Sequence, residues 1–180
     1  AMSGDKVWVA SDAFTGATPL SVSAATPSGE TVVDALNGAS YSLSNLLLGL
    51  HSGPYGETSA LLILLGGVFL LITGVASWRI MLSTVLGATL VGVIFNLIGS
   101  DTNPVMNLPF YYQFLMGGFM FGTVFMTTDP VTAAATNTGK WLFGLLVGAL
   151  VMLIRVVNPA YPEGMMLAIL FGNAFAPLFD

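Results

Sequence analysis

Two aspartates stand at the ends of long apolar segments in this 180-residue chain, where ionisable side chains are costly and often functional. Asp129 closes an uncharged run in FMTTDPV, and Asp180 ends the run NAFAPLFD. Carboxylates at the end of a membrane span are suited to receive a cation, so both are candidate cation ligands. Structural roles stay open, because Asp129-Pro130 also matches a helix cap followed by the first helical residue, and Asp180 also suits a membrane interface.

Two glutamates and the single histidine are less strongly indicated as functional groups. Glu57 and Glu163 stand where a helix would begin and where an acid is stabilised by the helix dipole, so this structural role is the favoured interpretation. His51 follows a short apolar run and is expected to be a loop residue, with a proton relay as the alternative.

The polar stretch SDAFTGATPL near the N-terminus offers hydroxyl groups rather than carboxylates. Gly16 supplies conformational freedom and Pro19 fixes φ, so the local pattern predicts a turn. Thr15 and Thr18 place their hydroxyls on that turn. Local physics alone therefore indicates an N-terminal loop.

The amino-acid composition indicates that the segments that carry these candidate residues belong to a membrane protein. Hydrophobic residues make up 55% of the chain and charged residues 7%, whereas soluble domains carry about 25% charged residues. The four basic residues are scattered, which excludes a nucleic-acid-binding patch. The chain has no cysteine, which excludes disulfides, iron–sulfur clusters and thiolate zinc sites within it.

Hydropathy predicts an all-α, polytopic membrane helical bundle. Residues 1–42 are expected to lie outside the bilayer, and residues 43–180 to form the bundle. Leu43–Leu50 is too short to span, since spanning takes about 20 residues, and is expected to be a re-entrant half-helix broken at Gly53-Pro54. Five spans are predicted after it, namely Thr58–Trp78, Ile80–Ser100, Thr102–Thr128, Trp141–Val157 and Met165–Phe179.

Charged and small residues within these spans have their own expected roles. Arg155 lies inside the fourth span, so its head is expected to extend toward the membrane interface. Arg79 and Lys140 are separated by two predicted spans and share a side, which the positive-inside rule makes cytoplasmic. Three small-residue pairs are expected to serve helix packing without a functional role: Ala88-x-x-x-Gly92, Gly118-x-x-x-Gly122 and Gly144-x-x-x-Gly148.

The N-terminal stretch also resembles the flavinylation motif D-x-x-[ST]-G-A-[ST], in which the last hydroxyl residue carries FMN through a phosphoester. The matching residues are Asp12, Thr15, Gly16, Ala17 and Thr18, which makes Thr18 the acceptor. The segments GETSALLILLGG, GSDTNP, TDPV and NPAYPEGMMLAILF look like the C-terminal half of the B subunit in the Na+-translocating NADH:quinone oxidoreductase family. The sister D subunit of the RNF electron-transport complex shares the flavin motif, GETSALLILLGG and TDPV.

This resemblance implies a fold, a cofactor and a place in a larger complex. The family subunit has two related five-helix halves similar to the urea-transporter fold, and this chain would be the second half. FMN on Thr18 would accept electrons from a neighbouring flavoprotein subunit and pass them toward riboflavin and ubiquinone, the chemistry belonging to the flavin. The family's Na+-handling carboxylates map onto Asp129 and Asp180.

The resemblance also implies partners and a location. The chain would work in the bacterial inner membrane with the other subunits of a respiratory complex, and the fragment alone is expected to be inactive. A flavin transferase would attach FMN to a segment on the extracytoplasmic side. The RNF subunit is one alternative, and a channel-like transporter half without flavin, which does not need Thr18, is another.

Overall fold

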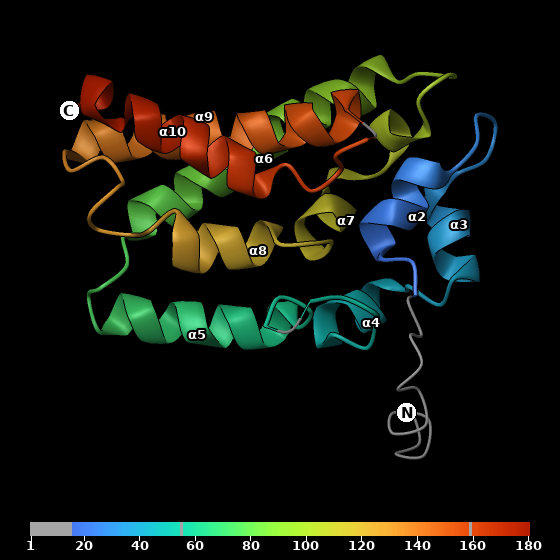
Figure 1. The fold of residues 1–180 in the computed structure, drawn as a ribbon, viewed down its shortest axis with the longest axis horizontal. Helices are drawn as coiled ribbons and strands as arrows, with labels where there is room; N and C mark the ends of the chain where they lie inside the picture. The colour runs from blue at the N-terminus through green and yellow to red at the C-terminus, as the bar shows by residue number, and fades with distance from the viewer. Residues whose placement is uncertain (1–15, 55, 159) are drawn as a thin grey trace.

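The computed structural model describes residues 16–54, 56–158 and 160–180. Within these ranges the chain is helical and contains no strand, which confirms the predicted all-α class. The longer helices run side by side, and Figure 1 shows α2 and α3 together at the end of the molecule opposite the C-terminus. Two ends of the bundle are thereby defined, one near α2 and one near the C-terminus.

The two longest helices, α6 (Trp78–Ile98) and α9 (Asn137–Val157), form the centre of the bundle. Each has 21 residues and is long and apolar enough to cross a membrane. They are parallel, because Gly144 of α9 lies against Ser83 whereas Met152, two turns further along, lies against Gly92. At Gly148 an added Cβ would collide with the Thr84 carbonyl oxygen, so the small residues do bring the two backbones together as predicted.

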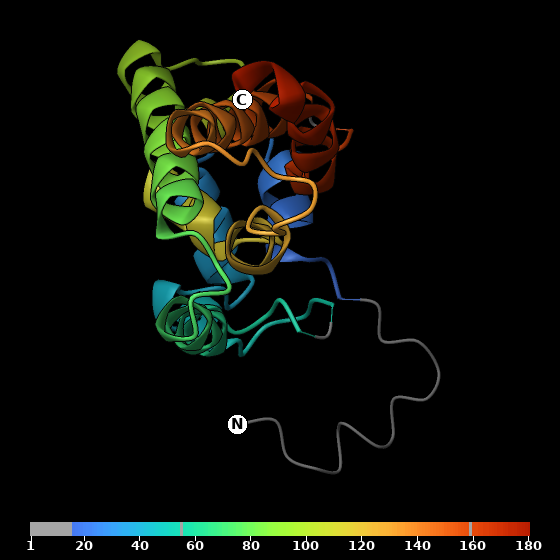
Figure 2. The same cartoon turned by 90° about the vertical axis from the view of Figure 1, so that its left-hand side faces the viewer.

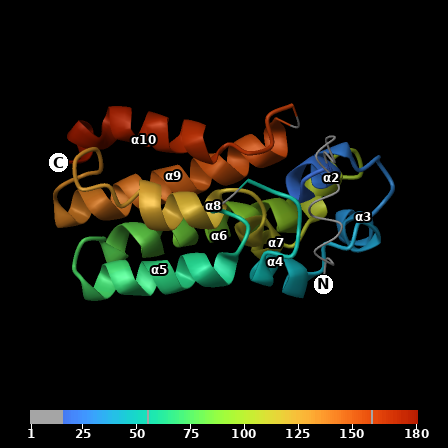
Figure 3. The same cartoon turned by 60° about the horizontal axis from the view of Figure 1, so that its bottom comes forward.

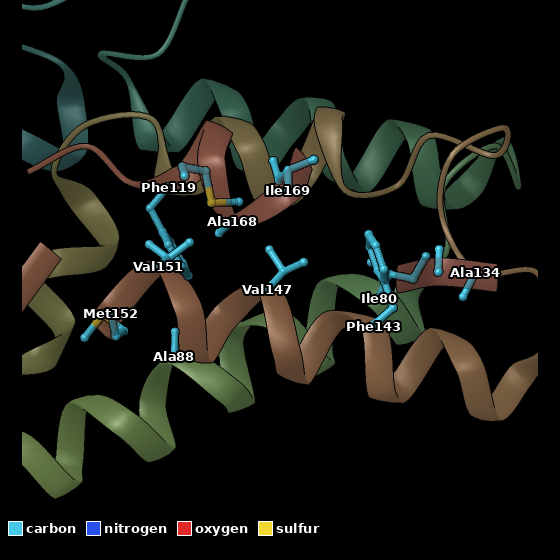
Figure 4. Close-up of a cluster of buried hydrophobic side chains, with 12 residues drawn as sticks. Ile80, Ala88, Phe119, Ala134, Phe143, Val147, Val151, Met152, Ala168 and Ile169 are labelled. Carbon is cyan, nitrogen blue, oxygen red and sulfur yellow. The ribbon is translucent and has the colours of Figure 1, made fainter. Parts of the chain in front are cut away.

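Helix α10 (Met165–Phe179) returns antiparallel along α9 and completes the main core. Val147 and Val151 of α9 gather with Ala168 and Ile169 of α10 around Phe119, as Figure 4 shows. Full burial of such side chains is worth about 1.5–3 kcal/mol each. This contact fixes the two ends of α10 against the two ends of α9.

The predicted first span, Thr58–Trp78, is shorter in the structure, whereas the last span has the predicted bounds, Met165–Phe179. Helix α5 covers Ala60–Ile72, and α10 has 15 residues, so neither reaches the length of α6 or α9. Their outer faces are apolar nevertheless, and side chains more than 60% exposed include Leu62, Phe69, Ile72 and Leu178. Apolar surface of this extent requires lipid or another protein to cover it.

The predicted span Thr102–Thr128 is wrong as a single helix. It consists of η1 (Pro104–Asn107), α7 (Phe110–Leu115), α8 (Phe119–Phe121) and a π-helical turn, η2 (Gly122–Met126). Met116 is extended and Gly117 has φ +59°, a conformation that glycine adopts readily, so the helix stops and restarts there. The broken segment lies between α5 and α10, in yellow in Figure 2 and as α8 in Figure 3.

The remaining helices, α2 (Pro19–Ala25), α3 (Val32–Gly38) and α4 (Leu43–Leu48), are short and amphipathic. The half-helix predicted after residue 42 is present, although it ends earlier than predicted, at Gly49 with φ +82°. Leu20, Leu36 and Leu46 form a second core with Leu108 and Met116. These helices are thus packed directly onto the segment that contains the break.

Candidate functional site

Thr18 begins α2, where its side chain caps the helix. The backbone N–H of Ser21 donates to Thr18 Oγ1 at 3.3 Å, and the Ser21 hydroxyl donates to the Thr18 carbonyl at 2.8 Å. Thr18 is half-buried, and Pro19 next to it is buried in the first helical turn. Of the other motif residues, Asp12 and Thr15 lie outside the described residues.

Two side chains from outside the motif hold the backbone in front of Thr18. Tyr41 donates its hydroxyl to the Ala17 carbonyl at 2.6 Å, and Ser52 Oγ donates to the same carbonyl at 3.2 Å. The two hydroxyl oxygens are 2.8 Å apart. A Cβ on Gly16 would lie 3.0 Å from Ser52 Oγ, so a glycine suits this close approach.

A cavity of about 90 Å³ opens beside Thr18. Its lining joins the motif to the break in the helix and includes His51, Glu57, Gly117 and Glu163. An apolar cavity that binds benzene measures about 150 Å³, so an isoalloxazine ring is too large for this space. Thr18 lines this cavity, and the hydrogen bonds of its Oγ1 are to Ser21 in the first turn of its own helix.

The prediction that the head of Arg155 extends toward the membrane interface is wrong. Its side chain does not extend to an interface but is buried, with 2% exposure. It donates from Nη1 to the Gln113 carbonyl, from Nη2 to the Met116 carbonyl at 3.1 Å, and from Nε to the Glu163 carbonyl at 3.1 Å. The last carbonyls of a helix have no partner within it, and the break at Met116 leaves such groups for the guanidinium to satisfy.

Glu163 and Glu57 converge on the residue at which the broken helix restarts. The Gly118 N–H donates to Glu163 Oε1 at 2.8 Å, and a Cβ on Gly118 would lie 2.6 Å from Glu57 Oε2. The helix-packing role predicted for Gly118 is therefore wrong. Its N–H donates to the Glu163 carboxylate, and the absence of a side chain leaves room for the Glu57 carboxylate. Glu163 also lies 3.6 Å from Arg155 Nη2.

The helix-dipole role predicted for these glutamates is not their main interaction, because neither lies in the first turn of α5 or α10. Ser59, not Glu57, caps α5, with its Oγ accepting from the Leu62 N–H at 3.4 Å, and Gly164 precedes α10. Burial raises the pKa of the Glu57 carboxyl, and the negative charge of Glu163 adds to the rise. Arg155 and His51 oppose the rise with positive charge.

His51 lies in the loop before α5, as predicted. Its Nδ1 is 3.1 Å from the Ser52 carbonyl oxygen, and its Nε2 is 3.1 Å from the Thr58 carbonyl oxygen. These contacts fix the loop that carries Glu57 across the cavity from Thr18. The proton-relay role stays an untested alternative.

Asp129 and Asp180 each accept hydrogen bonds from the loop that connects η2 to α9. Asp180 accepts from the N–H groups of Ala135 and Thr136 at 2.9 and 2.8 Å. Asp129 accepts from the Thr132 N–H at 3.2 Å and hydroxyl at 2.7 Å. Asp129-Pro130 does not start a helix, because α9 begins only at Asn137 after its cap, Thr136.

Hydrogen bonds favour the ionised form of both aspartates. The Thr132 hydroxyl is the main cause that lowers the Asp129 pKa, and the Ala135 N–H is the main cause that lowers the Asp180 pKa. Across residues 16–54, 56–158 and 160–180, no three side chains of His, Asp or Glu are grouped as in a metal site. Both carboxylates retain lone pairs for a monovalent ion.

The two candidate sites occupy opposite ends of the bundle. Asp180 lies near Gly139 at the start of α9, since a Cβ there would be 2.8 Å from Asp180 Oδ1. Glu163 contacts Arg155 in the last turn of the same helix. The rise of α9 between Gly139 and Arg155 is about 24 Å, so the aspartates and the Thr18 cavity are separated by most of a membrane thickness.

The fold and these sites define an α-helical membrane protein with a discontinuous helix next to its cavity. The whole chain, residues 1–180, matches the model of the NQR2, RnfD, RnfE family, and the chain belongs to that family. It is 54% identical over 179 residues to the B subunit of the Na(+)-translocating NADH-quinone reductase of Azotobacter vinelandii, and 53% to that of Klebsiella pneumoniae strain 342. In each case 99% of this chain is covered but only 43% of the relative, so the chain spans less than half of their length.

Proposed function

We propose that the chain is the C-terminal half of the membrane electron-carrier subunit of a redox-driven sodium pump. In this proposal it passes electrons from NADH, by way of FMN on Thr18, toward riboflavin and ubiquinone, and the transfer is coupled to Na+ movement. The assignment to such a complex is supported by relatives that are 52–55% identical and are B subunits of the Na(+)-translocating NADH-quinone reductase. The flavin assignment is carried by one observation, the motif-matched hydroxyl of Thr18 at the opening of a cavity.

FMN, when bound, supplies the electron-transfer chemistry. The protein holds the attachment point through contacts that do not involve the acceptor oxygen: Tyr41 and Ser52 fix the Ala17 carbonyl, and Pro19 starts the helix behind Thr18. An anchor through the phosphate leaves the ring free to exchange electrons. The half-buried position of Thr18 leaves its hydroxyl accessible to a flavin transferase.

The proposal includes a membrane arrangement with this chain as one five-helix half of a urea-transporter-like subunit in the bacterial inner membrane. Its support is the pairing of the helix ends that carry Arg79 and Lys140. Trp78 and Trp141 pack edge to face at 6.1 Å, and Ser83 Oγ donates to the Lys140 carbonyl at 3.2 Å. If these basic residues face the cytoplasm, the Thr18 cavity at the other end of α9 faces outward.

Asp129 and Asp180 are the proposed Na+-handling carboxylates, at the end of the bundle opposite the Thr18 cavity. Their support is that both acids accept hydrogen bonds from the same loop, residues 129–136, and that these bonds lower the pKa of each carboxyl. The distance of about 24 Å along α9 means that direct charge attraction from the flavin to this end is weak in a screened environment. Coupling would therefore have to act through movement of the helices.

In-gel flavin fluorescence of the denatured full-length subunit, expressed in its complex with the flavin transferase present, tests the proposal. Thr18→Ala should abolish the fluorescent band, and Thr18→Ser should keep it because the hydroxyl remains. Thr31→Ala is the matched control, since Thr31 also caps a helix through the Asp34 N–H but has no flavin role. A dark wild-type band, or a bright Thr18→Ala band, rules the flavin assignment out and favours a transporter half without flavin.

The two pump families differ in their electron donor and acceptor. A complex of the RNF type oxidises or reduces ferredoxin, whereas the favoured complex reduces ubiquinone with NADH. Quinone reduction measured with NADH in membranes distinguishes them.

The Na+ dependence of this quinone reduction tests the two aspartates. Asp129→Ala and Asp180→Ala should each raise the Na+ concentration needed for half-maximal rate. Asp101→Ala, in a distant loop, should not. Unchanged dependence in both aspartate variants removes them from the ion path.

A further inference from the structure

The cavity beside Thr18 connects the proposed flavin anchor to an ionisable group that electron carriage alone does not require. Thr18 and Glu57 line the same space of about 90 Å³. Such a volume has room for a few water molecules, and its lining of hydroxyl and carboxyl groups offers them partners. Protons can therefore reach Glu57 from the side on which Thr18 lies.

Among the described residues, three charged or titratable groups near this cavity affect Glu57. Glu163 comes from the loop before α10, Arg155 from α9 and His51 from the loop that precedes Glu57 itself. Arg155 is already engaged, since it donates to the carbonyls of Gln113 and Met116 and to that of Glu163. The single buried guanidinium is thus shared between two carboxylates and the broken helix.

The two glutamates are not equivalent in this arrangement. Glu163 accepts a hydrogen bond from the Gly118 N–H at 2.8 Å and lies 3.6 Å from Arg155 Nη2, so its carboxylate has two direct partners. Glu57 is half-buried, and desolvation and the charge of Glu163 both raise the pKa of its carboxyl. An additional negative charge nearby would favour protonation of Glu57 further.

We propose that Glu57 takes up a proton when the redox group on Thr18 is reduced and releases it when that group is reoxidised. The inference rests on the flavin attachment proposed above. Electrons arrive from the neighbouring flavoprotein subunit, and the proton comes from water: an O–H bond forms at a Glu57 carboxyl oxygen, and the same bond breaks on reoxidation. The protonated carboxyl then offsets the negative charge that reduction brings to this side of the membrane.

The test is the pH dependence of the midpoint potential of the flavin on Thr18, measured by spectroelectrochemistry in the purified complex. At a pH between the pKa values that Glu57 has in the oxidised and in the reduced protein, reduction should be accompanied by proton uptake at the flavin and at Glu57. Glu57→Gln should reduce the slope of potential against pH about twofold, because one of these uptakes is lost. Glu57→Asp should retain most of the slope, and Glu30→Gln, at an exposed position, should leave it unchanged.

The outcomes separate this inference from the proposed function. A dark wild-type subunit in the fluorescence gel overturns both. A fluorescent Glu57→Gln subunit with the wild-type slope overturns the role of Glu57 alone. If Glu57→Gln does not assemble, the reduced-minus-oxidised infrared spectrum of the wild type decides: a protonated-carboxyl C=O band should appear and shift in Glu57→Asp, and its absence overturns the inference.

Discussion

Tyr41 donates its hydroxyl to the Ala17 carbonyl at 2.6 Å, across 24 residues of the chain. The contact is reinforced because Ser52 Oγ approaches both oxygens, at 2.8 Å from the tyrosine hydroxyl and 3.2 Å from the carbonyl. The carbonyl belongs to the residue directly before Thr18, so the position of the acceptor hydroxyl depends on two loops outside the motif.

Tyr41→Phe should loosen this attachment point without removing the acceptor. One hydrogen bond contributes about 0.5–1.5 kcal/mol, so we expect a loss of stability of that size and a lower yield of covalent flavin. The measurements are the thermal unfolding of the purified complex and the flavin fluorescence per subunit. Tyr161→Phe, at an exposed position, is the control and should change neither. A Tyr41→Phe subunit with wild-type yield and stability would contradict the role.

Replacement of Arg155 should be the most damaging single change near the cavity. Arg155→Met leaves the Gln113 and Met116 carbonyls without their donor, and each buried acceptor left unsatisfied costs about 1–3 kcal/mol. The Glu163 carboxylate also loses its partner, but its side chain is 38% exposed, so solvent reduces that loss. Arg155→Lys keeps the charge but not the planar fork, so we expect an intermediate loss. Unfolding of the detergent-solubilised complex, followed by circular dichroism, measures both.

Arg79→Met is the matched control, because Arg79 is also a basic residue of a long helix. It lies over the Trp78 ring, with its guanidinium carbon 5.2 Å from the ring centroid, a contact worth about 0.5–1 kcal/mol at an exposed site. If Arg155→Met and Arg79→Met had the same small effect, Arg155 would not stabilise the broken helix.

Hydropathy and spacing were sufficient to predict the parts of the fold that depend on local composition. The long apolar runs predicted α6 and α9, and small residues such as Gly144 and Gly148 predicted their close contact. A sum of hydropathy over a window does not register an interruption, however. Thr102–Thr128 was therefore predicted as one span, although Gly117-Gly118 in its centre was the available signal for a break.

The cavity could not be predicted because its parts are far apart in the sequence. Arg155 looked like an interfacial residue near the end of a helix, and only the fold brings the free carbonyls of Gln113 and Met116 to it. Glu57 and Glu163 likewise resemble helix-dipole partners in the sequence, whereas the fold brings both carboxylates to Gly118. The motif around Thr18, by contrast, is contiguous and was visible in the sequence.

Gly148→Ala should separate α6 from α9. The added Cβ would collide with the Thr84 carbonyl oxygen and lie 2.8 Å from the Ala88 nitrogen. Both are backbone atoms of a packed helix, so relief requires movement of the helix and should cost about 1–3 kcal/mol. Gly38→Ala is the matched control: nothing lies within 4 Å of its Cβ position in α3, so it should stabilise by about 0.5–1 kcal/mol. Thermal unfolding should move in opposite directions for the two variants.

Asp180 should make the C-terminal end of α10 sensitive to acid. Backbone hydrogen bonds from Ala135 and Thr136 hold its pKa below the ordinary value of 3.8, so its ionised form stabilises the folded state. For a lowered pKa this contribution is fully present above 3.8, and it is lost as the pH falls through the folded-state pKa. Asp180→Asn should therefore flatten the decline of the unfolding temperature below about pH 4. Asp34→Asn, on α3, is the control, and equal acid profiles for wild type and Asp180→Asn would contradict a stabilising role for this carboxylate.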